Sequence, residues 1–360
     1  MRILWITKPP ADGAGGDEIF DRKIIMEAEA QGAHVMRLSP QRVSKMAQGV
    51  NVIKGLAHYR DRYDSKVNSL ALREAASGAD VAICAGESFD RLATEIPCPV
   101  IPVLHNITSN VFRSILPRNP VGRLLAAQAS RWERVAYATS QFPVMAVLSR
   151  SDYAHLCRAR PAETVLYTPP GMPRSVPLAP CSEFKAEILV SGTFTWYPKR
   201  RDLILFSREY AAQKRQVPVF ADPLPRQARQ VLPAHPMPLK FDDGIRLGLI
   251  PDRFVAGHKL KATYYIANNA IVLSYADITM EFEDIEDHEF FIRKIDHAAD
   301  IERHVAEIAQ VTPDVLVRRM EVFKRRCAER FSWSGSAGTL IAAAARQASR
   351  PKQSAERFLH

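Results

Sequence analysis

The strongest constraint on the fold is a recurring pattern of short, unbroken apolar runs that alternate with segments of helical spacing. The runs cover residues 1–7, 34–38, 81–85, 100–104, 144–148 and 165–167 in the first half, and 187–190, 217–220, 239–241 and 271–274 in the second. Unbroken apolar runs of this length are typical of parallel strands that helices bury on both faces. The pattern therefore predicts an α/β fold.

A proline-rich segment divides this pattern into two halves. Residues 168–184 hold five prolines in 17 positions, a composition typical of a linker, and the alternation of strands and helices starts again after it. A chain of 360 residues is also long enough for two domains. We therefore expect a first domain over residues 1–168, a linker over 169–184 and a second domain over 185–334.

The composition limits the partners and the compartment. A formal net charge of +10 and a pI near 9.4 favour an acidic partner: a phosphorylated ligand, an anionic membrane surface or nucleic acid. Nucleic acid is not expected, because no known binding module or aromatic–basic interleaving is present. The five cysteines are scattered and never in CxxC spacing, which indicates a reducing compartment and argues against structural zinc. Without a recognisable signal peptide or membrane-spanning run, a cytoplasmic location is expected.

Two basic stretches of the first domain also contain regularly spaced apolar residues. Residues 41–66 and 111–134 each combine several lysines or arginines with apolar residues near helical spacing. A helix of this kind can lie on the anionic inner face of a membrane as a peripheral contact. A solvated surface helix is the alternative.

A glycine turn follows the first strand, at the edge where open parallel sheets bind ligands. Gly15 and Gly16 form the turn, and Asp17 can cap the helix expected over residues 18–31. Because the turn departs from GxGxxG, a plain strand–helix turn is the alternative to a dinucleotide site. His105 ends a later strand and is expected at the same edge of the sheet.

The segment 251–274 contains the clearest candidate for an anion site. Gly257 precedes Lys259, Lys261 and a helical pattern. A glycine that opens a helix exposes backbone N–H groups, and lysines there oppose the helix dipole unless an anion lies between them. The alternative is the solvated first turn of an ordinary helix. The acidic segment 281–289 has no fixed ligand spacing, so a solvated loop is expected there rather than a metal site.

Taken together, these segments resemble the GT-B glycosyltransferases, most closely the family-4-like enzymes called group 1. The matching stretches are the Gly15-Gly16 loop, VMAVLSRSDYAHL at 144–156, TVLYTPPGM at 164–172, ILVSGTFTWYPKRRDLILF at 188–206 and IRLGLIPDRFVAGHKLKATYYIANNAIVLS at 245–274. The likeness covers most of the chain. It implies two Rossmann-like domains that face each other across a cleft, with the acceptor in the first and the donor in the second. It also implies that the small-residue helix 335–348 crosses back onto the first domain.

The resemblance implies a hexosyltransferase-like enzyme. Such an enzyme would move a sugar from a nucleotide-diphosphate sugar to a glycan or a polyprenyl-linked saccharide, in bacterial surface polysaccharide synthesis. Two other functions stay open: a non-catalytic protein that binds a nucleotide or sugar phosphate, and a nucleotide-sugar epimerase of related fold.

The sequence departs from the family pattern in the donor segment. Family-4 enzymes usually carry two glutamates eight positions apart, where this chain has Ala256 and Tyr264. Thr193 replaces a common arginine, whereas Lys199 falls where the family has its diphosphate-binding lysine. The departures leave the donor sugar and the stereochemical course open.

The resemblance and the residue types together assign the site. Without metal ligands, cations and helix N-termini must stabilise the leaving diphosphate, so no metal and no cofactor are expected. The donor-binding candidates are Gly16, Gly192, Thr193, Lys199, Arg253, Gly257, Lys259, Lys261 and Tyr264. An inverting enzyme also needs a base near the acceptor hydroxyl, for which Asp17, Glu18 and His105 are the candidates, whereas a retaining enzyme needs none.

Overall fold

The structure is a computed structural model that describes residues 1–9, 15–53, 63, 65–115, 120–137, 142–179, 182–213, 217–255 and 257–349. The chain divides into two compact units. Unit 1 comprises Met1–Pro170, Ala256–His258 and Trp333–His360, and unit 2 comprises Gly171–Val255 and Lys259–Ser332. Parts of the two basic stretches, residues 54–62, 64 and 116–119, lie outside the described residues.

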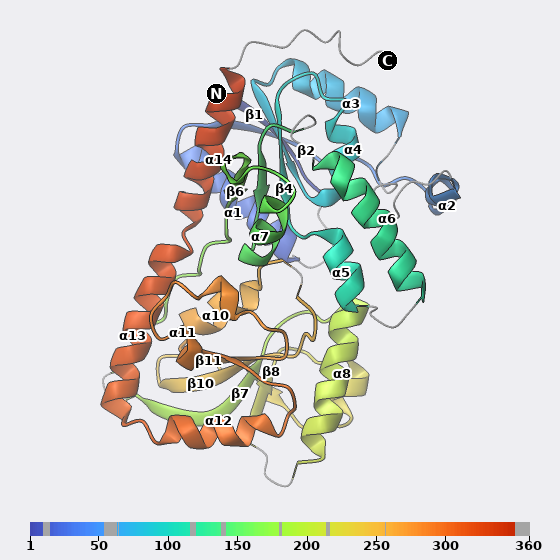
Figure 1. Cartoon of the computed structure of the whole chain (residues 1–360). Coiled ribbons are helices and arrows are strands. Elements are labelled where there is room, and N and C mark those ends of the chain that lie inside the picture. Colours follow the sequence, from blue (N-terminus) through green and yellow to red (C-terminus); the bar gives the residue numbers. More distant parts are fainter. Residues whose placement is uncertain are drawn as a thin grey trace. The chain divides into compact units, whose positions relative to one another are not determined.

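Unit 1 is built on a six-stranded parallel sheet with the order β2-β1-β3-β4-β5-β6 (Figure 1). Its strands are β1 (Arg2–Ile6), β2 (His34–Leu38), β3 (Val81–Ala85), β4 (Val100–Leu104), β5 (Met145–Val147) and β6 (Val165–Tyr167). Successive side chains of β1 enter opposite cores: Ile3 and Trp5 pack on one face of the sheet, Leu4 and Ile6 on the other. Burial on both faces is what the unbroken apolar runs predict, and the α/β class is confirmed.

The helices of unit 1 cover both faces of this sheet. They are α1 (Gly16–Ala30), α2 (Lys45–Ile53), α3 (Lys66–Ser77), α4 (Asp90–Ala93), α5 (Thr108–Ile115), α6 (Pro120–Ala136), α7 (Arg150–Cys157) and α14 (Trp333–Ala348), with 3-10 turns at Glu87–Phe89 and Ala162–Thr164. The stretch 41–66 thus contains α2 and only the first residue of α3. The stretch 111–134 is divided between α5 and α6. No described helix is long and apolar enough to cross a membrane.

The last helix of the chain, α14, packs against the first helix, α1. Its fully buried Ala337, Ala343 and Ala344 belong to the same core as the α1 side chains. Ser336 Oγ donates to the carbonyl of Pro169 at 2.7 Å, and Gln31 Nε2 of unit 1 donates to the carbonyl of Ser334 at 3.0 Å. Small residues allow a close approach here, because they leave little side-chain volume between the helices.

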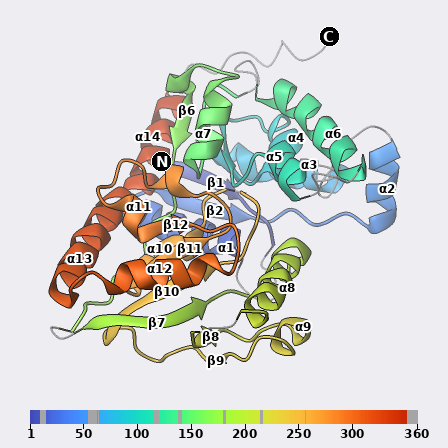
Figure 2. The same cartoon turned by 60° about the horizontal axis from the view of Figure 1, so that its bottom comes forward.

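Unit 2 repeats the architecture with a second six-stranded parallel sheet, in the order β12-β11-β10-β7-β8-β9. Its strands are β7 (Glu183–Val190), β8 (Val219–Ala221), β9 (His235–Pro236), β10 (Gly244–Ile250), β11 (Ala270–Ser274) and β12 (Ile292–Lys294). Figure 2 shows β7, β8 and β9 along one side of this sheet, with α8 and α9 beside them. A hydrophobic core with residues from β7, β10 and β11 packs around the sheet.

The central strand β10 of unit 2 differs from the prediction made from the sequence. Residues 239–241 form no strand, and β10, which lies between β7 and β11, was missed as a strand. The reason is Arg246, which interrupts the apolar run of β10 and is nevertheless buried. Its guanidinium group pairs with Glu187 at 2.6 Å and with Asp243 at 2.9 Å, so the charge is compensated inside the sheet.

The helices of unit 2 include a basic one that pairs with two acids of the segment 281–289. The helices are α8 (Tyr197–Ala211), α9 (Arg226–Arg229), α10 (Leu260–Ala267), α11 (His288–Phe291), α12 (Asp300–Ala309) and α13 (Pro313–Arg330), with a 3-10 turn at Thr279–Glu281. Arg319 of α13 holds both carboxylate oxygens of Asp287 at 2.7 and 2.8 Å, and Arg330 holds Asp284 at 2.8 Å. The segment is therefore partly paired with α13, in contrast to the solvated loop expected from the sequence.

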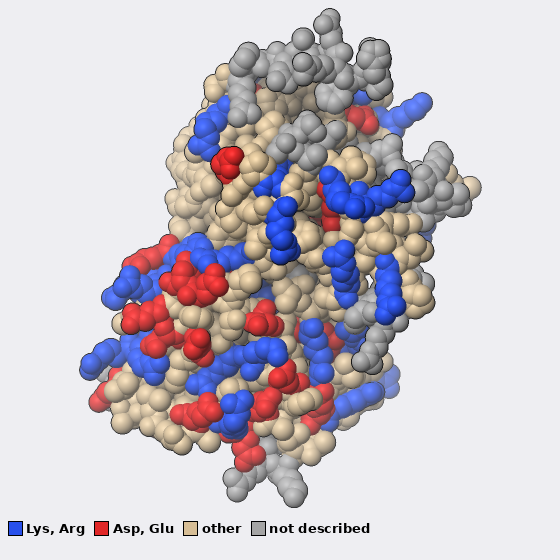
Figure 3. All heavy atoms as spheres, in the orientation of Figure 1, with Lys and Arg blue, Asp and Glu red and all other residues tan. Residues whose placement is uncertain are grey.

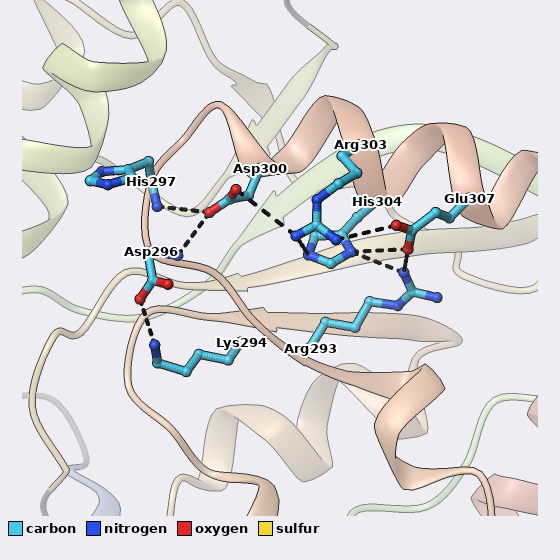
Figure 4. Close-up of polar contacts among 8 residues, drawn as sticks. All are labelled: Arg293, Lys294, Asp296, His297, Asp300, Arg303, His304 and Glu307. Atoms are coloured by element: carbon cyan, nitrogen blue, oxygen red, sulfur yellow. Dashed lines mark hydrogen bonds and ion pairs between the residues drawn. The ribbon is translucent and has the colours of Figure 1, made fainter.

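A polar network fixes the connection between β12 and α12 (Figure 4). One oxygen of Asp300, the first residue of α12, accepts the backbone N–H groups of Asp296 and His297 at 2.9 and 3.0 Å. Arg293 of β12 donates to Glu307 of α12 at 2.6 Å. These contacts satisfy local donors and acceptors, so the cluster in Figure 4 has a structural role: it holds the connection between β12 and α12.

A glycine in β10 makes room for the aromatic ring of Tyr265. A Cβ atom on Gly248 would lie 2.3 Å from Cγ of Tyr265, far inside van der Waals contact. The hydroxyl of Tyr265 donates to the carbonyl of Leu249 at 3.0 Å and accepts the backbone N–H of Ser191 at 2.7 Å. Gly248 thereby allows α10 to pack on the sheet and to hold the turn that follows β7.

We predict that Gly248→Ala destabilises the protein by roughly 1–3 kcal/mol, the usual cost of overpacking a core. Unfolding in urea, followed by tyrosine and tryptophan fluorescence, measures the change. Gly78→Ala is the matched control, because no atom lies within 4 Å of a Cβ at that position. An equal effect of the two substitutions would contradict the packing argument.

Candidate functional site

In unit 2, buried lysines gather around a single carboxylate. Lys259 precedes α10 and donates to Asp252 at 3.1 Å, and both side chains are buried. The ammonium group of Lys259 also lies 4.5 Å from the centre of the Phe254 ring. Burial opposes ionisation of Asp252, but Lys259, Lys261 and Lys199 outweigh it and lower the pKa of this carboxyl. Three ammonium groups thus act on this carboxylate, and the charges of Asp202 and Asp222 act in turn on Lys259 and Lys261.

Lys261 is the lysine of this group that a ligand can use. Its Nζ is shielded from solvent, finds no hydrogen-bond acceptor among the described residues, and lies 4.3 Å from the centre of the Phe194 ring. A Cβ on Gly192 would lie 2.7 Å from Cε of Lys261, so the glycine leaves the space that this side chain occupies. Burial, only partly offset by Asp252, lowers the pKa of Lys261 to about 8. A bound anion would stabilise its charged form.

The turn after β7 is held by two groups that the sequence analysis did not identify. Asp222, directly after β8, accepts from the Ser191 hydroxyl and from the Gly192 N–H, both at 2.8 Å. Tyr265 accepts the N–H of Ser191. The amide of Gly192, expected from the sequence to face a diphosphate, is therefore already engaged. Asp222 could have been identified only with knowledge of the strand order, because it lies near the turn after β7 as a result of β8 being the neighbour of β7 in the sheet.

The remaining donor-side candidates differ in their surroundings. Arg253 is paired with Glu209 and lies 4.4 Å above the ring of Tyr275, so its guanidinium group is engaged within unit 2. Lys199 is half-buried in the first turn of α8, where its charge reaches Asp252 and Lys259. The others are Thr193, which is exposed, Tyr264, half-buried on α10, Gly257, with φ +56°, and Gly16, which begins α1 in unit 1.

In unit 1, His105 lies between two carboxylates at the carboxyl end of β4. Its Nδ1 is 3.5 Å from Asp17 and its Nε2 is 3.9 Å from Asp21, and the ring is buried. Burial opposes protonation of the ring, but Asp17 and Asp21 outweigh it and raise the pKa of His105. Burial raises the pKa of Asp21, which also accepts a short hydrogen bond from Thr7.

Asp17 has a different role from the one its position in the sequence suggests. The residue before α1 is Gly15, which makes no side-chain cap, and Asp17 lies inside the first turn. Its carboxylate bonds Lys8 Nζ at 2.7 Å, and the charges of His105 and Lys8 overcome the effect of burial and hold its pKa well below the usual value. Glu18, the third predicted candidate, is half-buried on the same turn of α1.

Sequence spacing could not reveal Lys8 or Asp21 as members of this cluster. Lys8 follows β1, and Asp21 lies one helical turn after Asp17, so the parallel sheet and α1 bring them to the end of β4. Within the described residues no group of His, Cys, Asp and Glu has the arrangement of a metal site. The cluster offers a buried imidazole whose proton affinity is raised by its neighbours.

Comparison with solved structures identifies the fold. A glycosyltransferase from Rickettsia africae ESF-5 is 9% identical with a TM-score of 0.60, covering 97% of this chain and 99% of that one. An alpha,alpha-trehalose-phosphate synthase (UDP-forming) from Burkholderia vietnamiensis is 11% identical with a TM-score of 0.58 and covers 96% of each chain. The lipopolysaccharide outer core galactosyltransferase WaaB is 13% identical with a TM-score of 0.56, covering 95% of this chain and 99% of that one. Comparison with protein-family models and with curated proteins gives no match.

These similarities extend over nearly the full length of the chain and establish the GT-B fold. The two parallel six-stranded sheets, each covered by helices, agree with it. The fold class predicted from the sequence, two Rossmann-like α/β halves, is confirmed.

We predict that the contribution of His105 to stability decreases as the pH rises. A histidine with a raised pKa in the folded state stabilises fully below its unfolded pKa, near 6.5, and the effect is lost as the pH passes the raised value. The free energy of unfolding of the wild type should therefore fall relative to His105→Gln between about pH 6 and pH 8. Urea unfolding of both proteins across this range measures the difference, and His34→Gln, at an exposed position of β2, is the control. A difference that stays constant or grows with pH would refute the assignment.

Proposed function

We propose that this protein is a glycosyltransferase that moves a sugar from a nucleotide-diphosphate sugar to a hydroxyl group of a saccharide acceptor. The observation that carries the proposal is the lysine cluster at the carboxyl end of the unit 2 sheet, where Lys199, Lys259 and Lys261 act together on the buried carboxylate of Asp252 and Lys261 Nζ finds no hydrogen-bond acceptor among the described residues. Departure of a nucleoside diphosphate develops negative charge, and cations in a water-poor site stabilise that charge strongly.

In this proposal the lysines replace a metal ion. Lys261 and Lys199 contact the diphosphate, and Lys259 stays paired with Asp252 and fixes the geometry of the group. The transition state then needs no Lewis acid, because ammonium groups neutralise the leaving oxygen. Donor binding is therefore expected to be independent of divalent metal ions.

Unit 1 supplies the acceptor side in the same proposal. If the reaction inverts the configuration, His105 is the base, and because its pKa is raised, the neutral ring that accepts the proton forms only as the pH passes that raised value. Asp17 is a poor base because its pKa is low, and it instead orients and stabilises the imidazolium ion that forms. If the configuration is retained, the cluster positions the acceptor without removing its proton.

We predict that Lys261→Met and Lys199→Met each weaken the binding of a nucleoside diphosphate by roughly 1.5–3 kcal/mol, the range for a hydrogen bond to a charged group. Isothermal titration calorimetry with UDP and GDP measures the change. Lys185→Met is the matched control, because this lysine pairs with Asp243 near the start of β7. Unchanged affinity in both site variants, or binding that EDTA abolishes, would overturn the assignment.

The acceptor is proposed to be a lipid-linked saccharide of bacterial surface polysaccharide synthesis, reached from the cytoplasmic face of the membrane. Support comes from α6, whose exposed face carries Arg123, Arg131 and Arg134 beside the exposed apolar side chains of Leu124 and Val135. Figure 3 shows basic side chains with few acidic ones over unit 1 on this side, whereas the two alternate over unit 2. A basic face with apolar side chains suits peripheral binding to an anionic bilayer.

We predict that the protein floats with anionic but not with neutral vesicles in a density gradient at low salt. Each arginine near an anionic surface contributes about 1 kcal/mol, and this attraction is screened by salt. Arg123→Glu combined with Arg131→Glu should abolish flotation. The paired control, Arg325→Glu with Arg326→Glu on α13 of unit 2, should retain it. Absence of flotation at low salt would leave a soluble saccharide as the better acceptor.

A further inference from the structure

A second basic cluster in unit 1 has no role in the sites described above. It lies between α5 and α7 and consists of Arg113, His155 and Arg158, joined by Asn110. Arg113 donates to the amide oxygen of Asn110 at 3.3 Å, and the amide nitrogen of Asn110 lies 3.4 Å from Nδ1 of His155. Arg158 reaches the same Nδ1 at 3.2 Å.

The contacts fix the protonation pattern of the imidazole. The amide nitrogen of Asn110 and the guanidinium group of Arg158 can only donate, so Nδ1 of His155 accepts and the neutral ring carries its proton on Nε2. Burial, followed by the charges of Arg158 and Arg113, lowers the pKa of His155. The guanidinium groups of Arg113 and Arg158 therefore lie near a neutral His155 ring that can donate one N–H.

The segment that carries this cluster has no exposed carboxylate to balance it. Between residues 96 and 162 the sequence contains two acids, Glu133 and Asp152, and both are buried. Glu133 accepts the backbone N–H of Ser109 at 2.9 Å, and Asp152 accepts that of Ile107 at 3.3 Å and the hydroxyl of Ser149 at 2.8 Å. The charges of Arg113 and Arg158 thus lack an acidic partner within their own segment.

We propose that Arg113, His155 and Arg158 form a binding site for a terminal phosphate or diphosphate group. Guanidinium groups are suited to this ligand because their parallel N–H donors match the geometry of phosphate oxygens. The assignment of that group to a phosphorylated acceptor rests on the proposed glycosyltransferase function. The site itself does not, because it is defined by residues of unit 1 alone.

The proposal makes the titration of His155 depend on the ligand. A dianion that pairs with Arg113 and Arg158 removes the repulsion that disfavours the imidazolium ion, so the bound ligand should raise the pKa of His155. Arg113 on α5 and Arg158, which directly follows α7, are the charged groups whose charges act on this ring.

The test is an NMR titration of the full-length protein labelled with ¹³C and ¹⁵N in histidine, with the His155 signal assigned by its loss in His155→Gln. We expect saturating pyrophosphate to raise the pKa of His155. Arg113→Gln and Arg158→Gln should each increase the pyrophosphate concentration needed for half of that change roughly tenfold or more, as for the loss of a charge-assisted hydrogen bond. Arg37→Gln, at an exposed position of β2, is the matched control and should leave the titration unchanged. Sodium chloride at equal ionic strength controls for screening.

Three ligands separate the possible sources of the phosphate. Pyrophosphate and geranyl diphosphate should both act on His155 if the site recognises a terminal diphosphate. A response to phosphatidylglycerol vesicles alone would overturn the proposal in favour of contact with a lipid surface. An unchanged pKa of His155, or equal weakening by Arg37→Gln and Arg158→Gln, would also overturn it. The measurement needs no turnover, so its failure is distinct from a failure of UDP binding at Lys261 in unit 2.

Discussion

The arrangement of unit 2 depends on one buried carboxylate. Asp252 follows β10 and shares the compensation of Lys199, Lys259 and Lys261 with the more distant charges of Asp202 and Asp222. The protein holds Lys261 against an aromatic ring and lowers its pKa. Charges of equal sign that are held together cost stability, so the arrangement is most easily explained by an anionic ligand that binds among them.

The two candidate sites use opposite electrostatics at equivalent places in their sheets. In unit 1 the carboxylates of Asp17 and Asp21 surround His105 and raise its proton affinity. In unit 2 the lysines surround the carboxylate of Asp252 and lower its proton affinity. Both groups follow the carboxyl ends of parallel strands, where side chains from neighbouring strands converge.

The fold class was predictable from the sequence because most strands are unbroken apolar runs. The short edge strands β9 and β12 lack such a run, and so does the central strand β10, which contains Arg246 and two glycines; Glu187 and Asp243 neutralise the buried arginine. Spacing along the chain identified Lys259 and Lys261 together, but it could not show that the first is paired and the second is not. That difference arises from the contact of Lys259 with Asp252, seven residues earlier, and of Lys261 with the sequence-distant Phe194.

The net charge of +10 can be interpreted only once the charged residues are placed in the structure. On α13 of unit 2, Arg319 and Arg330 are paired with Asp287 and Asp284, so these arginines form ion pairs within the unit. The acids of the segment 96–162 are instead buried and bonded to backbone and hydroxyl donors, and the exposed arginines Arg113 and Arg158 form no ion pair with them among the described residues. Uncompensated positive charge on a surface attracts anions over about a Debye length, so an anionic partner is expected to make its first contact there. The basic pI therefore reflects a local feature of unit 1 and supports an anionic partner there.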